Sequence, residues 1–139
     1  MTSVTDEVLS WPGVSMHPER FGGNAFQVGS AEVGHIHHGG AVHIPFPRSV
    51  HDELLAQGLA EIHPYAPDTG MVSFQIRNDE DVEHALWLMR LSYLRYALKR
   101  VTEPGPMLDE ESERLKLSPQ LRMLMAPFVR VTAASPPAA

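Results

Sequence analysis

The segment from Asn78 to Arg100 constrains the fold more than any other part of this sequence. Asn78 is a good helix-capping residue, three acidic residues follow it directly, and basic residues gather near the other end of the segment. Charges placed in this way stabilise a helix because they oppose its macrodipole. We therefore predict one long helix over residues 78–100.

The apolar side chains of this predicted helix form two adjacent stripes. The first consists of Val82, Ala85, Leu86, Met89, Tyr93 and Tyr96, and the second of Trp87, Leu91, Leu94 and Leu98. A sheet covers only one stripe of a helix that packs on it, so the second stripe needs the C-terminal segment or a second copy of the chain. A structural homodimer, formed through the long helix or through the C-terminal extension, is therefore one expectation.

The segments that precede the long helix predict an antiparallel sheet. Strand-like patterns at 14–17, 25–28, 33–37 and 41–44 alternate with glycine-containing turns, and two more, at 60–65 and 71–76, flank a Pro-Asp-Thr-Gly turn. Short helices are expected at 5–10 and 48–57. The predicted fold class is α+β, with a short N-terminal helix and a sheet of about five or six strands covered by the long helix.

The chain divides into three parts on composition. A length of 139 residues suits a single core, which we place in one domain at residues 1–100. Residues 101–132 form a C-terminal helical extension, with a Pro-Gly linker at 103–106 followed by helices at 108–116 and 119–128. Residues 133–139 are rich in alanine and proline, and we expect a disordered tail there.

Composition excludes several classes of chemistry. The chain has no cysteine, so any metal ion must be bound by histidine and carboxylate side chains. A formal net charge of -6 disfavours general nucleic-acid binding, which needs a basic surface. The sequence also shows neither a signal peptide nor a long apolar run, so we expect a cytoplasmic protein with no membrane partner.

The stretch from Gly29 to His43 contains four of the eight histidines. Because side chains alternate along a strand, His35 and His37 lie on the same side of it. The spacing of Gly29, His35 and His37 matches the opening of the first cupin motif, but the glutamate that this motif requires next is absent. The histidines therefore mark a candidate site without completing a known metal motif.

Two functions are compatible with this stretch. The leading interpretation is a histidine-rich sheet surface that binds a small ligand or a protein partner, lined by His35, His37, Pro45, Phe46 and His63. The alternative is a histidine-dependent metal enzyme, with a divalent metal as cofactor and the ligand set His35, His37, His63 and Asp68. In both interpretations His38 and His43 are expected to lie outside the site.

Several motifs also occur in a characteristic order. They read W-P-G-V at 11–14, R-F-G-G at 20–23, G-H-I-H at 34–37, H-I-P-F-P-R at 43–48 and P-D-T-G-M-V-S-F-Q-I-R-N-D-E-D-V at 67–82. Over about residues 8–97 the chain resembles the small bacterial and fungal family labelled luciferase domain. The resemblance implies no particular catalytic residue or cofactor, and the sequence shows no flavin or adenylate motif, so light emission is not expected.

Overall fold

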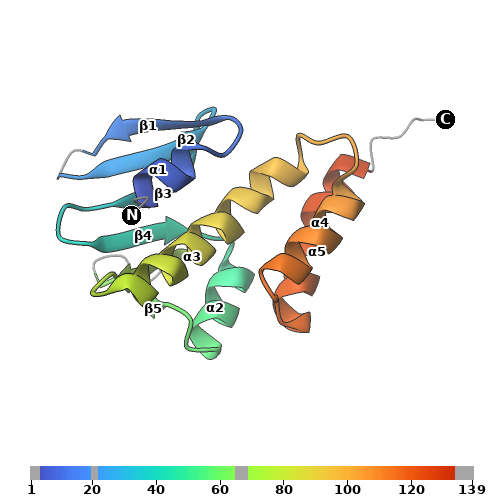
Figure 1. Ribbon diagram of the computed structural model, residues 1–139. Coiled ribbons are helices and arrows are strands. Elements are labelled where there is room, and N and C mark those ends of the chain that lie inside the picture. Colours follow the sequence, from blue (N-terminus) through green and yellow to red (C-terminus); the bar gives the residue numbers. More distant parts are fainter. Residues whose placement is uncertain (1–3, 20–21, 65–68, 134–139) are drawn as a thin grey trace. The chain divides into compact units, whose positions relative to one another are not determined.

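The computed structural model describes residues 4–19, 22–64 and 69–133, and within them the chain is an α+β protein (Figure 1). Six strands form one antiparallel sheet in the order β1-β2-β3-β4-β6-β5. The strands are β1 (Val14–Pro18), β2 (Asn24–Val28), β3 (Ala31–Ile36), β4 (Ala41–Pro45), β5 (Glu61–Ile62) and β6 (Met71–Gln75). The helices are α1 (Val4–Leu9), α2 (Arg48–Ala56), α3 (Asp79–Leu98), α4 (Pro104–Arg114) and α5 (Pro119–Ala133).

The long helix α3 begins as the sequence predicts. The side-chain oxygen of Asn78 accepts a hydrogen bond of 2.9 Å from the backbone N–H of Asp81. The Asp81 carboxylate in turn accepts one of 2.8 Å from the backbone N–H of Arg77. These two bonds fix the first turn of α3 against the end of β6.

Helix α3 covers one face of the sheet (Figure 1). On this face Val42, Ile44 and Val72 are at most 1% exposed. The Ser92 hydroxyl of α3 donates a hydrogen bond of 2.7 Å to the backbone carbonyl of Val33 in β3. The main core therefore lies between α3 and this face, and the opposite face of the sheet is available for other side chains.

In the middle of the chain, one predicted strand is shorter than expected and one predicted helix ends where expected. The strand predicted at 60–65 is reduced to the two residues of β5, and its last residue, Tyr65, lies outside the described residues. The glycine predicted to close the helix at 48–57 does so, because Gly58 adopts the left-handed conformation (φ 70°) directly after the C-cap residue of α2.

The C-terminal part corrects two expectations. Residues 103–106 are not a linker, because α4 begins at Pro104, and the fixed φ of proline suits the first turn of a helix. Helix α5 also continues past Phe128 to Ala133, which we had expected to be the first residue of the disordered tail. Residues 134–139 lie outside the described residues.

The structure separates into two compact units, Met1–Tyr93 and Leu94–Ala139. The second unit contains the helical hairpin α4–α5, in which Leu108, Leu121 and Met125 are buried. Arg122 of α5 forms an ion pair with Asp109 of α4. The sheet, its histidines and the first three-quarters of α3 all belong to the first unit.

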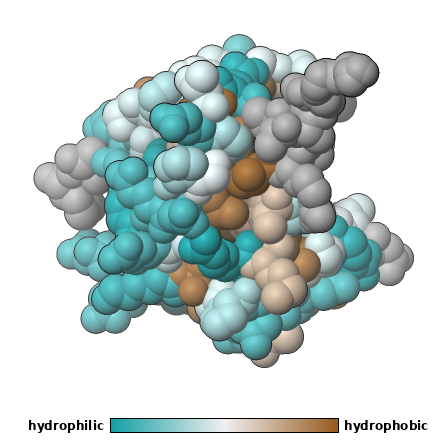
Figure 2. Space-filling view, turned by 90° about the vertical axis from the view of Figure 1, so that its right-hand side faces the viewer, coloured by the Kyte–Doolittle hydropathy of each residue, from teal (hydrophilic) through white to brown (hydrophobic). Residues whose placement is uncertain are grey.

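The surface in Figure 2 is mostly hydrophilic, and the hydrophobic residues seen from this side gather in a central band. Large exposed hydrophobic side chains among the described residues include Met123 of α5, which is 73% exposed. Among the described helices, none combines the length and the apolar character that crossing a membrane requires.

Candidate metal centre

The face of the sheet opposite α3 carries most of the histidines, and we call it the histidine face. The hairpin of β3 and β4 places His35 directly opposite His43, and the register continues across the neighbouring strands. Residues paired across a sheet lie on the same face. One transverse row on this face therefore contains His17, Ala25, His35, His43, Ser73 and Glu61.

Two imidazoles of this row, those of His35 and His43, meet the imidazole of His37, which follows β3, and we call these three residues the three-histidine cluster. His43 Nδ1 lies 3.3 Å from His35 Nε2 and 3.2 Å from His37 Nε2. Two nitrogens bound to one tetrahedral zinc ion, at about 2.0–2.1 Å each, are separated by about 3.3–3.4 Å. All three ligand atoms lie within 4.8 Å of one another, and the two distances that meet at His43 Nδ1 match those between two ligands of one ion.

The other ring nitrogens of His35 and His37 are held by acceptors. His35 Nδ1 lies 2.9 Å from the carboxylate of Glu32, and His37 Nδ1 lies 3.1 Å from the backbone carbonyl of Gly22. Because these oxygens accept, each Nδ1 carries the hydrogen, and in the neutral ring Nε2 keeps its lone pair. This is the outer-shell arrangement typical of metal-binding histidines.

Two local backbone features create these outer contacts. A bulge at Val33 shifts the register between β2 and β3, so that Glu32 and His35 share a face although they are three residues apart. Gly22 and Gly23 both adopt positive φ, and a Cβ at Gly23 would lie 2.0 Å from the carbonyl oxygen of Ile36. Glycine at position 23 thus lets the turn approach the end of β3 closely enough to reach His37.

Of the rings in the cluster, His43 has a pKa that is strongly lowered, so this ring stays neutral at neutral pH. Burial lowers the pKa of His43 to about 4, and the neighbouring His63, His35 and His37 add to this effect. Burial also lowers the pKa of His35, but the hydrogen bond and charge of Glu32, helped by Glu19, outweigh burial and raise it above its ordinary value. His43 therefore offers an unprotonated nitrogen at neutral pH, as a metal ligand must.

Of the predicted ligand set, His35 and His37 are brought together, and the position of His63 is adjacent. The ring centroids of His63 and His43 are 4.1 Å apart, and the pKa of His63 is lowered by burial and by His35 and His37. Asp68 lies outside the described residues. A second potential group of ligands, Glu19, Glu32 and His35, adjoins the cluster and shares His35 with it.

The structure groups His43 with His35 and His37, although the sequence led us to expect His43 outside the site, because its Nδ1 lies within 3.3 Å of a nitrogen of each of the other two rings. Glu32 was not among the predicted site residues. His38 is exposed and is in neither group of potential metal ligands found among the described residues.

The two apolar residues predicted to line a ligand surface differ in exposure. Pro45 lies on β4 two residues after His43, so it belongs to the histidine face and is partly exposed. Phe46 is only 5% exposed and forms part of the core. A ligand surface built around Phe46 stays a prediction.

Comparison with known proteins gives one result. A family model described as Luciferase domain matches residues 30–92, a segment that includes the three-histidine cluster, Glu32 and His63. No curated protein sequence and no solved structure matches the chain.

Proposed function

We propose that the chain, whose residues 30–92 match the family model described as Luciferase domain, binds one divalent transition-metal ion through His35, His37 and His43. The observation that carries this proposal is the pair of nitrogen–nitrogen distances, 3.2 and 3.3 Å, that meet at His43 Nδ1. Imidazole ligands favour zinc, copper, nickel and iron over magnesium and calcium.

The protonation pattern supports the same proposal. Three ring nitrogens meet, but the Nε2 atoms of His35 and His37 both carry lone pairs when the rings are neutral, because their hydrogens are on Nδ1. A single hydrogen on His43 Nδ1 is the only proton that three neutral rings can place between them. A cation at this point would interact with all three lone pairs at once, once that hydrogen moves to Nε2 of His43.

The number of ligands suggests what the ion would do. Sites with three protein ligands keep a fourth position for water or a substrate, whereas structural zinc sites have four protein ligands. A water molecule in that position becomes a nucleophile near neutral pH, and a carbonyl or phosphoryl oxygen there is polarised. The histidine-rich surface and the metal enzyme inferred from the sequence then describe one site, in which the metal ion is the point of attachment for a small ligand.

Calorimetric titration with Zn²⁺ and visible absorption with Co²⁺ test the proposal. We expect one ion per chain and the absorption bands of tetrahedral Co²⁺. Replacing a coordinating ring should weaken binding more than the 10- to 100-fold typical of outer-shell changes, so His35→Ala, His37→Ala and His43→Ala should each weaken it by about 100-fold or more. His38→Ala is the matched control, because His38 belongs to the same stretch but is exposed.

Two outcomes would refute the proposal. One is the absence of stoichiometric binding by a chain whose circular dichroism shows that it is folded. The other is an equal loss of affinity in His38→Ala and His43→Ala, which would mean that the ion binds to scattered surface histidines.

A further inference from the structure

The histidine face continues past His43 toward β5, and three further side chains border the three-histidine cluster there. The ring of His63, which comes directly after β5, lies 4.1 Å from the ring of His43, centroid to centroid. Met71 of β6 is paired with Pro45 of β4, and residues paired across a sheet share a face, so Met71 lies on the histidine face with Pro45. His63, Pro45 and Met71 are all half-buried. One imidazole and two apolar side chains therefore adjoin the cluster on this side.

His63 lies beside the cluster and not in it. It belongs to neither group of potential metal ligands found among the described residues, whose ligand atoms all lie within 4.8 Å of one another. A donor that hydrogen-bonds an oxygen atom on a metal ion lies up to about 5 Å from that ion, because both the metal–oxygen bond and the hydrogen bond separate them. A ring that contacts one of the ligand rings, as His63 contacts His43, occupies this outer zone.

We propose that His63, Pro45 and Met71 select the ligand that binds to the ion, and that this ligand is a short-chain monocarboxylate; the inference rests on the metal site proposed above. One carboxylate oxygen binds the ion at its fourth position, and the other accepts a hydrogen bond from the N–H of His63. An imidazole carries at least one N–H in both its neutral and its protonated form, so this contact needs no particular protonation state. The alkyl chain lies on Pro45 and Met71, where it is removed from water.

Other small ligands lack one of these interactions. An alcohol has a single oxygen, so the same atom has to serve both the ion and the N–H of His63. An alkylammonium ion has no lone pair for the metal and is repelled by its charge. Formate and phosphate have the oxygens but no alkyl chain, so Pro45 and Met71 contribute nothing to their binding.

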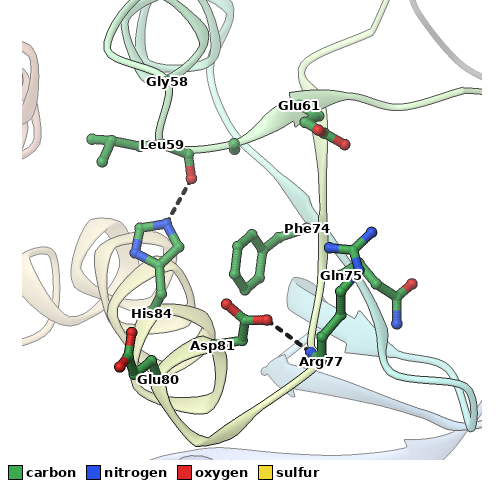
Figure 3. A pocket seen from close by; sticks show the side chains of 10 residues that line it. Gly58, Leu59, Glu61, Phe74, Gln75, Arg77, Glu80, Asp81 and His84 are labelled. Atoms are coloured by element: carbon green, nitrogen blue, oxygen red, sulfur yellow. Dashed lines mark hydrogen bonds between the residues drawn. The ribbon is translucent and has the colours of Figure 1, made fainter.

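A hollow at the start of α3 offers a small molecule a second place to bind (Figure 3). Phe74, in the wall of this hollow, lies on the face of the sheet that α3 covers, and Figure 3 shows its ring between His84 and Asp81. The carboxylates of Glu80 and Asp81 line the hollow against the single guanidinium of Arg77, so a carboxylate gains little there. The amide of His84 therefore reports binding away from the ion.

The test is a titration of the Co²⁺-loaded full chain with butyrate, followed by the visible absorption of Co²⁺. We expect a saturable change, with affinity that falls from butyrate to acetate to formate, and no saturable change with n-butylammonium or 1-butanol. In the Zn²⁺-loaded chain, ¹⁵N–¹H NMR should show butyrate-induced shifts at the amides of His63 and Met71 and none at His84.

Variants separate the roles of the three side chains. His63→Phe keeps a ring but removes the N–H, so it should weaken butyrate binding by about five- to tenfold and leave Co²⁺ affinity nearly unchanged. His63→Gln keeps an N–H donor and should recover most of the butyrate affinity. Met71→Ser should weaken butyrate binding by about two- to fivefold without changing formate binding. His38→Ala, the matched control, should change none of these values.

The outcomes that would overturn the inference differ from those that would refute the metal site. A chain that binds no Co²⁺ refutes both. Co²⁺ binding without a response to butyrate, equal butyrate affinity in the wild type and His63→Phe, or shifts at His84 in place of His63 refute the inference alone. A loss of Co²⁺ affinity in His63→Phe as large as that in His43→Ala would make His63 a ligand of the ion and would also overturn it.

Discussion

At the scale of single residues, the nitrogens of the site differ in how readily they take up a proton. The unfolded chain protonates a histidine near pH 6.5, whereas the pKa of His43 in the folded protein is lowered to about 4 by burial and by the neighbouring His63, His35 and His37. Between these values the unfolded state binds more protons, so His43 makes the folded protein less stable as the pH falls. His35 has the opposite sign: its raised pKa stabilises the fold fully below pH 6.5 and loses that effect only above it.

This difference predicts an acid-sensitive stability in the metal-free protein. Urea unfolding in EDTA should show that stability falls between about pH 6.5 and 4.5. The fall should be smaller by about 1–2 kcal/mol in His43→Gln, after allowance for partial screening by solvent. Equal falls in the two proteins would contradict the assigned environment of His43.

Glu32 leads to a second prediction at this scale. Glu32→Gln replaces a charged acceptor at His35 Nδ1 by a neutral one, so Zn²⁺ affinity should fall by about 10- to 100-fold in calorimetric titration. In the metal-free protein the pKa of His35, followed by NMR, should also fall, because Glu32 raises it. Glu83→Gln is the control for the loss of one negative charge, and a matching loss of affinity in that variant would argue against a specific role for Glu32.

The residues of the site were only partly predictable. Alternation alone puts His35 and His37 on one face, and a hairpin centred on Gly39 would also have paired His35 with His43, since the two are equidistant from that turn. The signal for His43 was thus present in the spacing. The contact between Glu32 and His35 was not predictable, because it depends on a bulge at Val33 that no local sequence pattern indicates.

At the scale of elements, well-punctuated segments were predicted best. Helix α3 has its capping residue and its charges in sequence, and both hydrogen bonds at its start are present. The strand predicted at 60–65 is only two residues long in the structure. Pro104, which we expected in a linker, begins α4. A proline near an element boundary is compatible with both a loop and a first helical turn, so local sequence does not decide between them.

The contact between β3 and α3 predicts that substitution by alanine reduces stability much more at one glycine than at another. A Cβ at Gly34 would lie 2.7 Å from the sulfur of Met89 and 3.1 Å from Cγ1 of Ile44, and both of these side chains are fully buried. Gly34→Ala should therefore destabilise the protein by about 1–3 kcal/mol in urea unfolding. Gly39→Ala should change stability by less than about 0.5 kcal/mol, because nothing lies within 4 Å of its added Cβ. Similar losses in both variants would show that α3 does not pack closely on β3.

At the scale of the whole molecule, α3 is the element that links the two units, since the division between Tyr93 and Leu94 falls inside it. A metal ion that binds only the folded first unit stabilises that unit directly. Helix α3 contributes residues to both units, and a helix forms cooperatively. Unfolding of its first three-quarters should therefore also unfold its last turn. The second unit should then unfold together with the first.

Thermal unfolding with two probes measures this coupling. Both tryptophans, Trp11 and Trp87, lie in the first unit, whereas far-ultraviolet circular dichroism also detects α4 and α5. Zinc at about 100 times its Kd adds roughly 2.7 kcal/mol, which should raise Tm by about 8–12 °C for a chain of this size. We expect the same rise with both probes, and none in His43→Ala, because that variant lacks the nitrogen on which the other two rings converge. A circular-dichroism transition that zinc leaves in place, beside a tryptophan transition that moves, would instead mean that α4 and α5 unfold independently of the sheet.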